Sequence, residues 1–225
     1  MTTTAPGNHS WIKLSSVLAI AIAVIVLAHC ADWWTLHHLA MPRFQESDLG
    51  RMFRIVGFIP LWICIAIAIV LTSDETSSLR ARMRRGVLVL SSAIVGGMVA
   101  EVAKILIRRE RPSDGIDHYV FRPWGDDALY SGGFGLPSSH VLVAFVGVAM
   151  LGYLYPRARI LWFVLGAGCA FSRIAAGAHF LSDVVVAAVL GYAVATTLWW
   201  FSSVRRAKIA ATSANAVPTS AVSPK

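Results

Sequence analysis

Charged residues are scarce in this chain of 225 residues: they make up 14% of it, whereas hydrophobic residues make up 56%. The mean hydropathy is +0.64. Since soluble domains usually carry about 25% charged residues, the composition excludes an ordinary soluble protein. A helix that spans a bilayer needs about 20 mostly apolar residues. Six apolar stretches approach this length, so the sequence predicts an all-α, polytopic membrane protein with six transmembrane helices.

Cysteine is also rare. The chain has three, Cys30, Cys64 and Cys169, each in or at the end of an apolar run, and no metal-type spacing joins them. We interpret them as core residues. A metal site that includes His37 and His38 is the alternative, but no helical or finger spacing supports it, and interfacial polar residues are the better interpretation. The sequence therefore predicts neither a metal nor another cofactor.

Acidic residues are outnumbered, with 12 Asp and Glu against 20 Lys and Arg, which gives a formal charge of +8 and a pI near 9.9. The basic residues are scattered through short loops, which excludes nucleic acid as the expected partner. The densest basic cluster precedes the third apolar run, at Arg80, Arg82, Arg84 and Arg85. By the positive-inside rule, this cluster is expected on the cytoplasmic side.

The expected organisation is one membrane domain, residues 11–204, between a polar tail at 1–10 and a flexible tail at 205–225. The six spans are expected at residues 14–30, 55–71, 86–107, 137–155, 160–176 and 180–201. Two longer polar segments, 31–54 and 108–136, are expected to be loops at the membrane interface, and the second is expected to cover part of a site.

The first apolar run has the outline of a signal peptide, with Lys13 in front of it. His29, however, stands where a cleavage site needs a small residue. We therefore interpret the run as a retained span.

Unusual polar residues stand at the ends of four spans. Alternate crossing from a cytoplasmic amino terminus places these ends together on the external face. The residues concerned are Lys104 and Arg111, then Ser138, Ser139 and His140, then Arg173, and finally His179 and Asp183. Ionisable groups near a bilayer are costly and are functional candidates by default. The topology therefore predicts one polar site at the external face.

The cations of this set favour an anionic ligand. Arginine presents a fork of donors that suits phosphate or carboxylate oxygens, and lysine supplies a mobile charge. Ser138 and Ser139 open the fourth span, where free backbone N–H groups and the helix dipole also favour an anion. The sequence thus predicts a phosphate cradle.

Two imidazoles add reactive chemistry to the cradle. His179 and Asp183 are four residues apart at the start of a helix, so they share one face. A carboxylate that accepts from one imidazole nitrogen leaves the other nitrogen free to attack. His140 arrives from another span and can serve as a proton donor. The pair favours phosphate transfer over simple binding.

Three motifs carry a family resemblance. They are Lys104 with Arg111-Pro112 after six residues, Pro137-Ser138-Ser139-His140, and Ser172-Arg173 followed at fixed spacing by His179 and Asp183. In order and spacing they resemble the signature of the type 2 phosphatidic acid phosphatase superfamily. Serine at position 139 departs from the glycine that is usual in the second motif.

The resemblance implies a metal-independent phosphatase of lipid phosphates or lipid pyrophosphates that works through a phosphohistidine. His179 would be the nucleophile, Asp183 would orient it, and His140 would protonate the leaving oxygen. The phosphoryl oxygens would be held by Lys104, Arg111, Arg173, Ser138 and Ser139. The expected partners are a lipid phosphate and the bilayer, and the expected location is a bacterial inner membrane with the site facing the periplasm.

Other functions stay open at this point. A lipid phosphotransferase would use the same phosphohistidine with another hydroxyl as acceptor. A vanadate haloperoxidase would use a similar cradle, but the relatives of that kind are soluble. A phosphate-lipid transporter or inactive binding homologue would need neither the His179–Asp183 pair nor His140.

Overall fold

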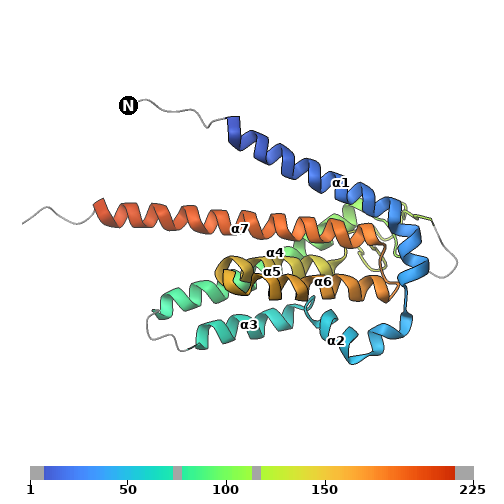
Figure 1. The fold of residues 1–225 in the computed structure, drawn as a ribbon, viewed down its shortest axis with the longest axis horizontal. Helices are drawn as coiled ribbons and strands as arrows, with labels where there is room; N and C mark the ends of the chain where they lie inside the picture. Colours follow the sequence, from blue (N-terminus) through green and yellow to red (C-terminus); the bar gives the residue numbers. More distant parts are fainter. Residues whose placement is uncertain (1–7, 73–77, 113–117, 216–225) are drawn as a thin grey trace, which may run out of the picture.

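The computed structural model describes residues 8–72, 78–112 and 118–215, and in these ranges the chain is helical apart from turns, loops and two isolated β-bridges. Figure 1 shows long helices that lie roughly along one direction, with α2 set across them. The helices are α1 (Asn8–Leu39), α2 (Asp48–Ile55), α3 (Ile59–Leu71), α4 (Leu79–Ile107), α5 (Ser139–Leu154), α6 (Arg159–Ala175) and α7 (Leu181–Asn215), with short 3₁₀ turns at Pro42–Glu46 and Pro156–Ala158.

Helix α5 forms the centre of the bundle. It packs against α4, α6 and α7, and most of its residues are buried. Its glycines allow close approach: a Cβ on Gly147 would lie 2.3 Å from the ring of Trp62, and Trp62 is fixed because its Nε1 donates to the Val56 carbonyl at 3.0 Å. The core therefore depends on small residues on the central helix.

The outer helices face the bilayer. Large apolar side chains on α1, α4 and α7 are exposed on the isolated chain, among them Ile20, Val102 and Tyr192. Four helices, α1, α4, α6 and α7, are long and apolar enough to cross a membrane, and α2 with α3 makes a fifth candidate that bends by 67°. The prediction of an all-α membrane protein is confirmed. Helix α5 has only 16 residues, which span about 24 Å.

Several helix ends differ from the sequence-based expectation. Helix α1 continues through Asp32 and Trp33 to Leu39, and a 3₁₀ turn and α2 follow from Pro42, so most of the expected 31–54 loop is helical. The expectation was wrong because two polar residues of this stretch face a folded interior: Asp32 is 2% exposed and Thr35 is 5% exposed. Helix α7 also runs on to Asn215, well into the expected tail. Residues 1–7 and 216–225 of the two tails lie outside the described residues.

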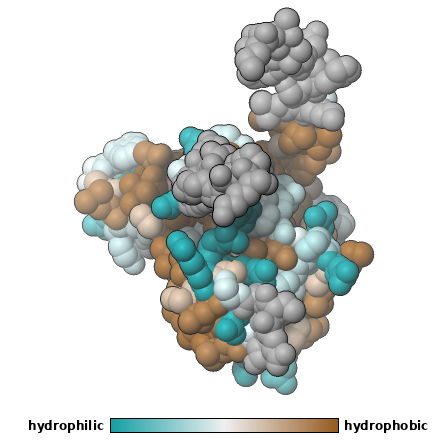
Figure 2. Space-filling view, turned by 90° about the vertical axis from the view of Figure 1, so that its left-hand side faces the viewer, coloured by the Kyte–Doolittle hydropathy of each residue, from teal (hydrophilic) through white to brown (hydrophobic). Residues whose placement is uncertain are grey.

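The two ends of the bundle have different characters. At one end, on the right in Figure 1, the C-terminal ends of α1, α4 and α6 meet the N-terminal ends of α5 and α7 and the segment 118–138. Figure 2 views the opposite end, where hydrophilic residues lie among apolar helix flanks. Arg84, Arg85 and Arg206 line a cavity of about 190 Å³ there. The basic residues thus lie at the far end from the predicted site.

Candidate active site

Among the described residues, five buried polar atoms at one end of the bundle have no hydrogen-bond partner. One is Arg54 Nε, on α2; the other four belong to α5, α6 and the turn before α7. These four are Ser138 Oγ, His140 Nε2, Arg173 Nε and His179 Nε2. The first two open α5, the third lies in the last turn of α6, and the fourth lies in the turn before α7. Buried polar groups are nearly always paired, so unpaired donors and acceptors gathered in one place indicate a ligand site. The four residues on α5, α6 and the turn before α7 belong to the set that the sequence predicts.

The tautomer of His179 follows from its contacts. Its Nδ1 lies 3.1 Å from the carbonyl oxygen of Gly135 and 3.5 Å from Asp183 Oδ2. Because both neighbours only accept, Nδ1 carries the proton and Nε2 presents a lone pair. Burial lowers the pKa of His179 to about 4, against the opposing effect of Asp183. The ring is therefore neutral at neutral pH, and Nε2 keeps a lone pair that no described residue engages.

Asp183 is fully buried and has several partners. Its Oδ1 accepts from Arg109 Nε at 3.2 Å and from a second Arg109 nitrogen, and its Oδ2 accepts from the Phe180 backbone N–H at 2.9 Å. Gly135 lies against the same carboxylate, because a Cβ there would be 2.8 Å from Oδ2. Asp183 thus has a role beyond contact with His179: it ties the 108–136 segment to the start of α7.

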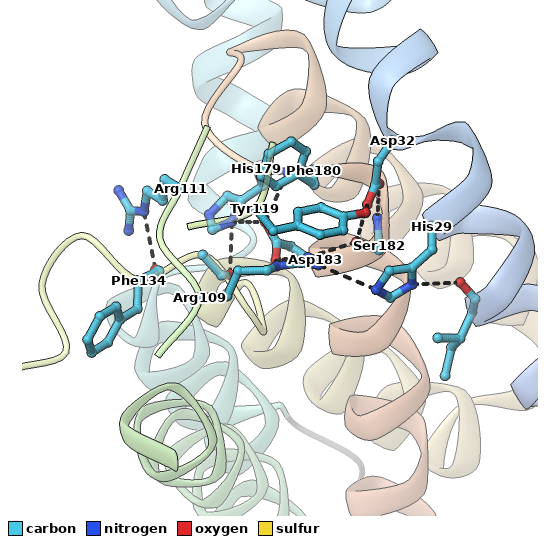
Figure 3. Close-up of polar contacts among 12 residues, drawn as sticks. His29, Asp32, Arg109, Arg111, Tyr119, Phe134, His179, Phe180, Ser182 and Asp183 are labelled. Atoms are coloured by element: carbon cyan, nitrogen blue, oxygen red, sulfur yellow. Dashed lines mark hydrogen bonds and ion pairs between the residues drawn. The ribbon is translucent and has the colours of Figure 1, made fainter. Parts of the chain in front are cut away.

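The network continues into α1, as Figure 3 shows. Asp32 accepts from the Ser182 backbone N–H at 2.6 Å, from the Ser182 hydroxyl, and from the Tyr119 hydroxyl at 2.6 Å. Arg109 donates to Ser182 Oγ at 2.7 Å and stacks 4.6 Å from the centre of the Tyr119 ring. Burial and the bond to Asp32 raise the pKa of Tyr119 to about 12, so the phenol stays a donor. The start of α7 is therefore held from α1 as well.

Lys104 and Ser139 share an acidic partner, Glu101. The Lys104 ammonium lies 3.3 Å from Glu101 Oε1, and the Ser139 hydroxyl donates to the same oxygen at 2.7 Å. The Ser131 hydroxyl donates to the other carboxylate oxygen. Because the Ser139 hydroxyl is engaged in this way, only its backbone N–H, in the first turn of α5, remains for an anion. Glu101 thus explains how serine is accommodated where the resemblance expects glycine.

Arg111 lies at the mouth of the site and is exposed. Its backbone N–H donates to the Gly133 carbonyl at 2.9 Å, and its Nε is 3.4 Å from the Phe134 carbonyl. The site thus holds all eight predicted residues at one end, with Arg111 the most accessible of them.

Sequence reasoning missed Arg109, Asp32 and Glu101. Arg109 looked like one charge among several in a polar loop, and Asp32 looked like an interfacial residue after the first span. The one signal in the sequence was that charged residues near a bilayer are costly and need partners. In the structure, Arg109 and Asp32 are buried, at 1% and 2% exposure. No sequence pattern distinguishes Arg109 from its exposed neighbour Arg111.

In the described part of the chain, no group of three or more His, Cys, Asp or Glu residues is placed to hold a metal ion. His37 and His38 stack on Trp33 and Trp34, and each donates from Nδ1 to the carbonyl four residues earlier. The geometry of these two histidines is that of interfacial residues on a helix.

Comparison with known proteins agrees with the motifs. The profile of the PAP2 superfamily matches residues 85–207, more than half of the chain. The chain belongs to the PAP2 superfamily. The matched region includes every predicted site residue, from Lys104 to Asp183. The family resemblance seen in the sequence is therefore confirmed.

Similar proteins of this superfamily are named as phosphatases. A lipid A 1-phosphatase from Rhizobium etli is 24% identical over 168 residues, which are 69% of this chain and 68% of that protein. A lipid A 1-phosphatase from Rhizobium johnstonii is 25% identical over 119 residues, 52% of this chain and 45% of that protein. These names bear out the predicted class of enzyme, a phosphoric ester hydrolase.

The fold also matches a solved structure. A crystal structure of a transmembrane PAP2 type phosphatidylglycerolphosphate phosphatase from Bacillus subtilis superposes with a TM-score of 0.59. The match covers 84% of this chain and 95% of that one at 20% identity. The present chain thus has the fold of a transmembrane PAP2 protein.

We predict that Arg109→Ala destabilises the protein by about 3 to 5 kcal/mol, because the buried Asp183 carboxylate would lose its cation. Activity should fall with it. Arg122→Ala is the matched control: Arg122 pairs with Glu110 in the same segment, at side-chain exposures of 22% and 33%, and such a pair contributes at most about 1 kcal/mol. Thermal unfolding in detergent measures both. Equal losses for the two variants would contradict a structural role for the Arg109–Asp183 pair.

Proposed function

We propose that this protein is a membrane-embedded, metal-independent phosphatase that removes the terminal phosphate of a lipid phosphate or lipid pyrophosphate through a phosphohistidine at His179. The single observation that carries the proposal is the state of His179 Nε2: it is buried, unpaired and unprotonated, and it lies among other unpaired polar atoms of the cradle. Membership of the PAP2 superfamily and the names of the similar phosphatases support it.

In the proposed first step, His179 Nε2 attacks phosphorus and a P–N bond forms as the bond from phosphorus to the lipid oxygen breaks. His140 gives a proton to the departing oxygen, so the lipid leaves as an alcohol or, from a pyrophosphate, as a monophosphate. Arg173, Arg111 and Lys104 offset the charge on the phosphoryl oxygens. Ser138 Oγ and the free N–H groups at the start of α5 add further donors.

In the proposed second step, water attacks phosphorus and the P–N bond breaks. His140 takes the proton from water, and inorganic phosphate leaves. The same imidazole thus acts as acid and then as base. Asp183 and the Gly135 carbonyl keep His179 in one tautomer through both steps.

The orientation in the membrane is also a proposal. Six spans arise if α2 with α3 counts as one bent span and the short, buried α5 counts as another. The basic residues at the start of α4 and the end of α7 favour a cytoplasmic position for that end. The site, at the other end, would then face the outside of a bacterial inner membrane.

For His179→Ala, we expect phosphate release from detergent-solubilised lipid phosphates to fall by at least about 10³-fold, the scale on which loss of a nucleophile acts. Wild-type activity should persist in EDTA, and rapid quenching should trap an acid-labile, base-stable phosphoenzyme. His38→Ala, on exposed α1, is the matched control. Wild-type rates in His179→Ala would refute the phosphohistidine, and loss in EDTA would refute metal independence.

For His140→Ala, we expect a loss of about 100-fold or more with lipid substrates, the usual scale for a general acid. An activated aryl phosphate should lose much less, because its leaving group needs no proton. The measurement is kcat/KM for both substrate types in wild type and variant. Equal losses would count against the acid role of His140.

For the topology, a reporter fused after Arg85 should be cytoplasmic, and one inserted near Asp126 should be external. Basic residues at the start of α4 determine the first outcome, because positive loops stay inside. Fluorescent and alkaline-phosphatase reporters together measure both positions. The reversed pattern would place the site on the cytoplasmic face.

A further inference from the structure

Arg54 is a cation that none of the three motifs contains. It lies in the last turn of α2, at the corner where the chain turns into α3, and is half-buried. Its guanidinium carbon lies 5.4 Å from the centre of the Phe58 ring. Its Nε is buried and is among the few such atoms with no hydrogen-bond partner. Like the cradle atoms, Arg54 Nε is therefore buried without a hydrogen-bond partner among the described residues.

The α2–α3 corner places Arg54 beside His140. The Phe58 ring meets the His140 ring edge to face, with 4.8 Å between centroids. Gly57 lies directly against His140, since a Cβ there would be 2.7 Å from His140 Cβ. The charge of Arg54 acts on both His140 and Arg173. Arg54 thus adds a positive charge on the His140 side of the site.

The corner that carries Arg54 is rigidly held. Helices α2 and α3 meet at 67°, and α2 packs on α6, whose last turn carries Arg173. The Gly57 N–H donates to the Arg54 carbonyl at 3.0 Å, and Trp62 holds the Val56 carbonyl. A side chain on such a corner has a defined position, unlike an arginine at a loose helix end.

The charge around the cradle exceeds what one phosphate needs. Four cations, Lys104, Arg111, Arg173 and Arg54, belong to the site. Among the described residues, Glu101 pairs with Lys104, whereas Asp183 is paired with Arg109, so three positive charges remain. Their positive charge is greater than the two negative charges of a phosphate monoester. A ligand with a second anionic group would balance it better.

The position of Arg54 indicates which part of the ligand carries the second anionic group. In an in-line transfer, the attacking nitrogen and the departing oxygen are on opposite sides of phosphorus. In the proposed mechanism His140 meets the departing oxygen. Arg54 reaches the His140 side of the site through the Phe58 ring, which contacts both residues, so its charge lies toward the leaving group. Neutral leaving groups, such as the diacylglycerol of phosphatidic acid, offer nothing for it to bind.

Building on the proposed function, we propose that Arg54 binds a second phosphate carried by the leaving group, so that the enzyme prefers lipids in which the departing oxygen belongs to, or lies near, another phosphate. Two sources supply this chemistry. In a lipid diphosphate the second phosphate is bonded directly to the departing oxygen, which takes the proton from His140 as the lipid monophosphate leaves. In phosphatidylglycerol phosphate a phosphodiester lies three carbons away.

The test compares the solubilised full chain with Arg54→Ala and Arg54→Lys on three substrates: a lipid diphosphate, phosphatidylglycerol phosphate and phosphatidic acid. Arg51→Ala, exposed one turn earlier on α2, is the matched control. For Arg54→Ala we expect kcat/KM to fall about 10- to 100-fold on substrates with the second phosphate, the scale for a hydrogen bond to a charged group. Phosphatidic acid should change less than about threefold, Arg54→Lys should recover part of the loss, and Arg51→Ala should match wild type.

The pattern of losses decides between the sources. A loss confined to the diphosphate identifies a directly bonded second phosphate, and a loss confined to phosphatidylglycerol phosphate identifies the more distant one; either supports the proposal. Equal losses on all three substrates, or none, would overturn it while leaving the phosphatase function intact. If wild type released phosphate from none of them, the inference would fail, and phosphate release from lipid A 1-phosphate would then decide the proposed function separately.

Inhibition gives a second readout that does not depend on lipid handling. With an aryl phosphate as substrate, inorganic pyrophosphate should inhibit wild type more strongly than inorganic phosphate does. Arg54→Gln, which keeps most of the side-chain volume, should weaken pyrophosphate inhibition about tenfold or more and leave phosphate inhibition nearly unchanged. Unchanged pyrophosphate inhibition would also overturn the proposal.

Discussion

The buried pair between Arg109 and Asp183 is the interaction on which the rest of the site depends. A carboxylate with no exposure is tolerated only if a cation and further donors surround it, and Arg109 and the Phe180 N–H meet that need. Because Arg109 comes from the segment after α4 and Asp183 from the start of α7, the pair fixes two parts of the chain relative to each other. Asp32 extends the same constraint to α1.

Close to this fully paired group, other polar atoms are buried without any hydrogen-bond partner among the described residues. Unpaired buried atoms such as His140 Nε2 and Arg173 Nε lower stability, because each has lost water without gaining a partner. The cost is sustainable where the surrounding chain is held by other interactions. His140 lies on buried α5 itself, and α6, which carries Arg173, packs against α5. The molecule thus separates the residues that secure the fold from the residues left open for a ligand.

The sequence predicted the open residues better than the securing ones. Ser138, His140, Arg173 and His179 could be found because motif spacing and span counting converge on one end of the bundle. Arg109 could not, because its burial depends on a long-range partner that no local pattern reveals. The end of α1 was misplaced for a related reason: Asp32 and its neighbours look interfacial until Ser182 and Tyr119 are known to surround the carboxylate. Long-range pairing, rather than hydropathy, determines both the burial of Arg109 and the end of α1.

The α2–α3 corner differs from the motif residues in the part of the substrate that it is proposed to meet. The residues proposed to meet the transferred phosphate lie on α4, the segment after it, α5, α6 and the turn before α7. All of them belong to the three sequence motifs. The α2–α3 corner lies outside residues 85–207, the region that matches the superfamily profile, yet Gly57 and Phe58 bring it against His140. In the proposed mechanism, the departing oxygen lies at His140, so a change at this corner would alter its surroundings while His179 and Lys104 stay in place. Under that proposal, variation at the corner would change the preference among lipids more than the phosphoryl chemistry.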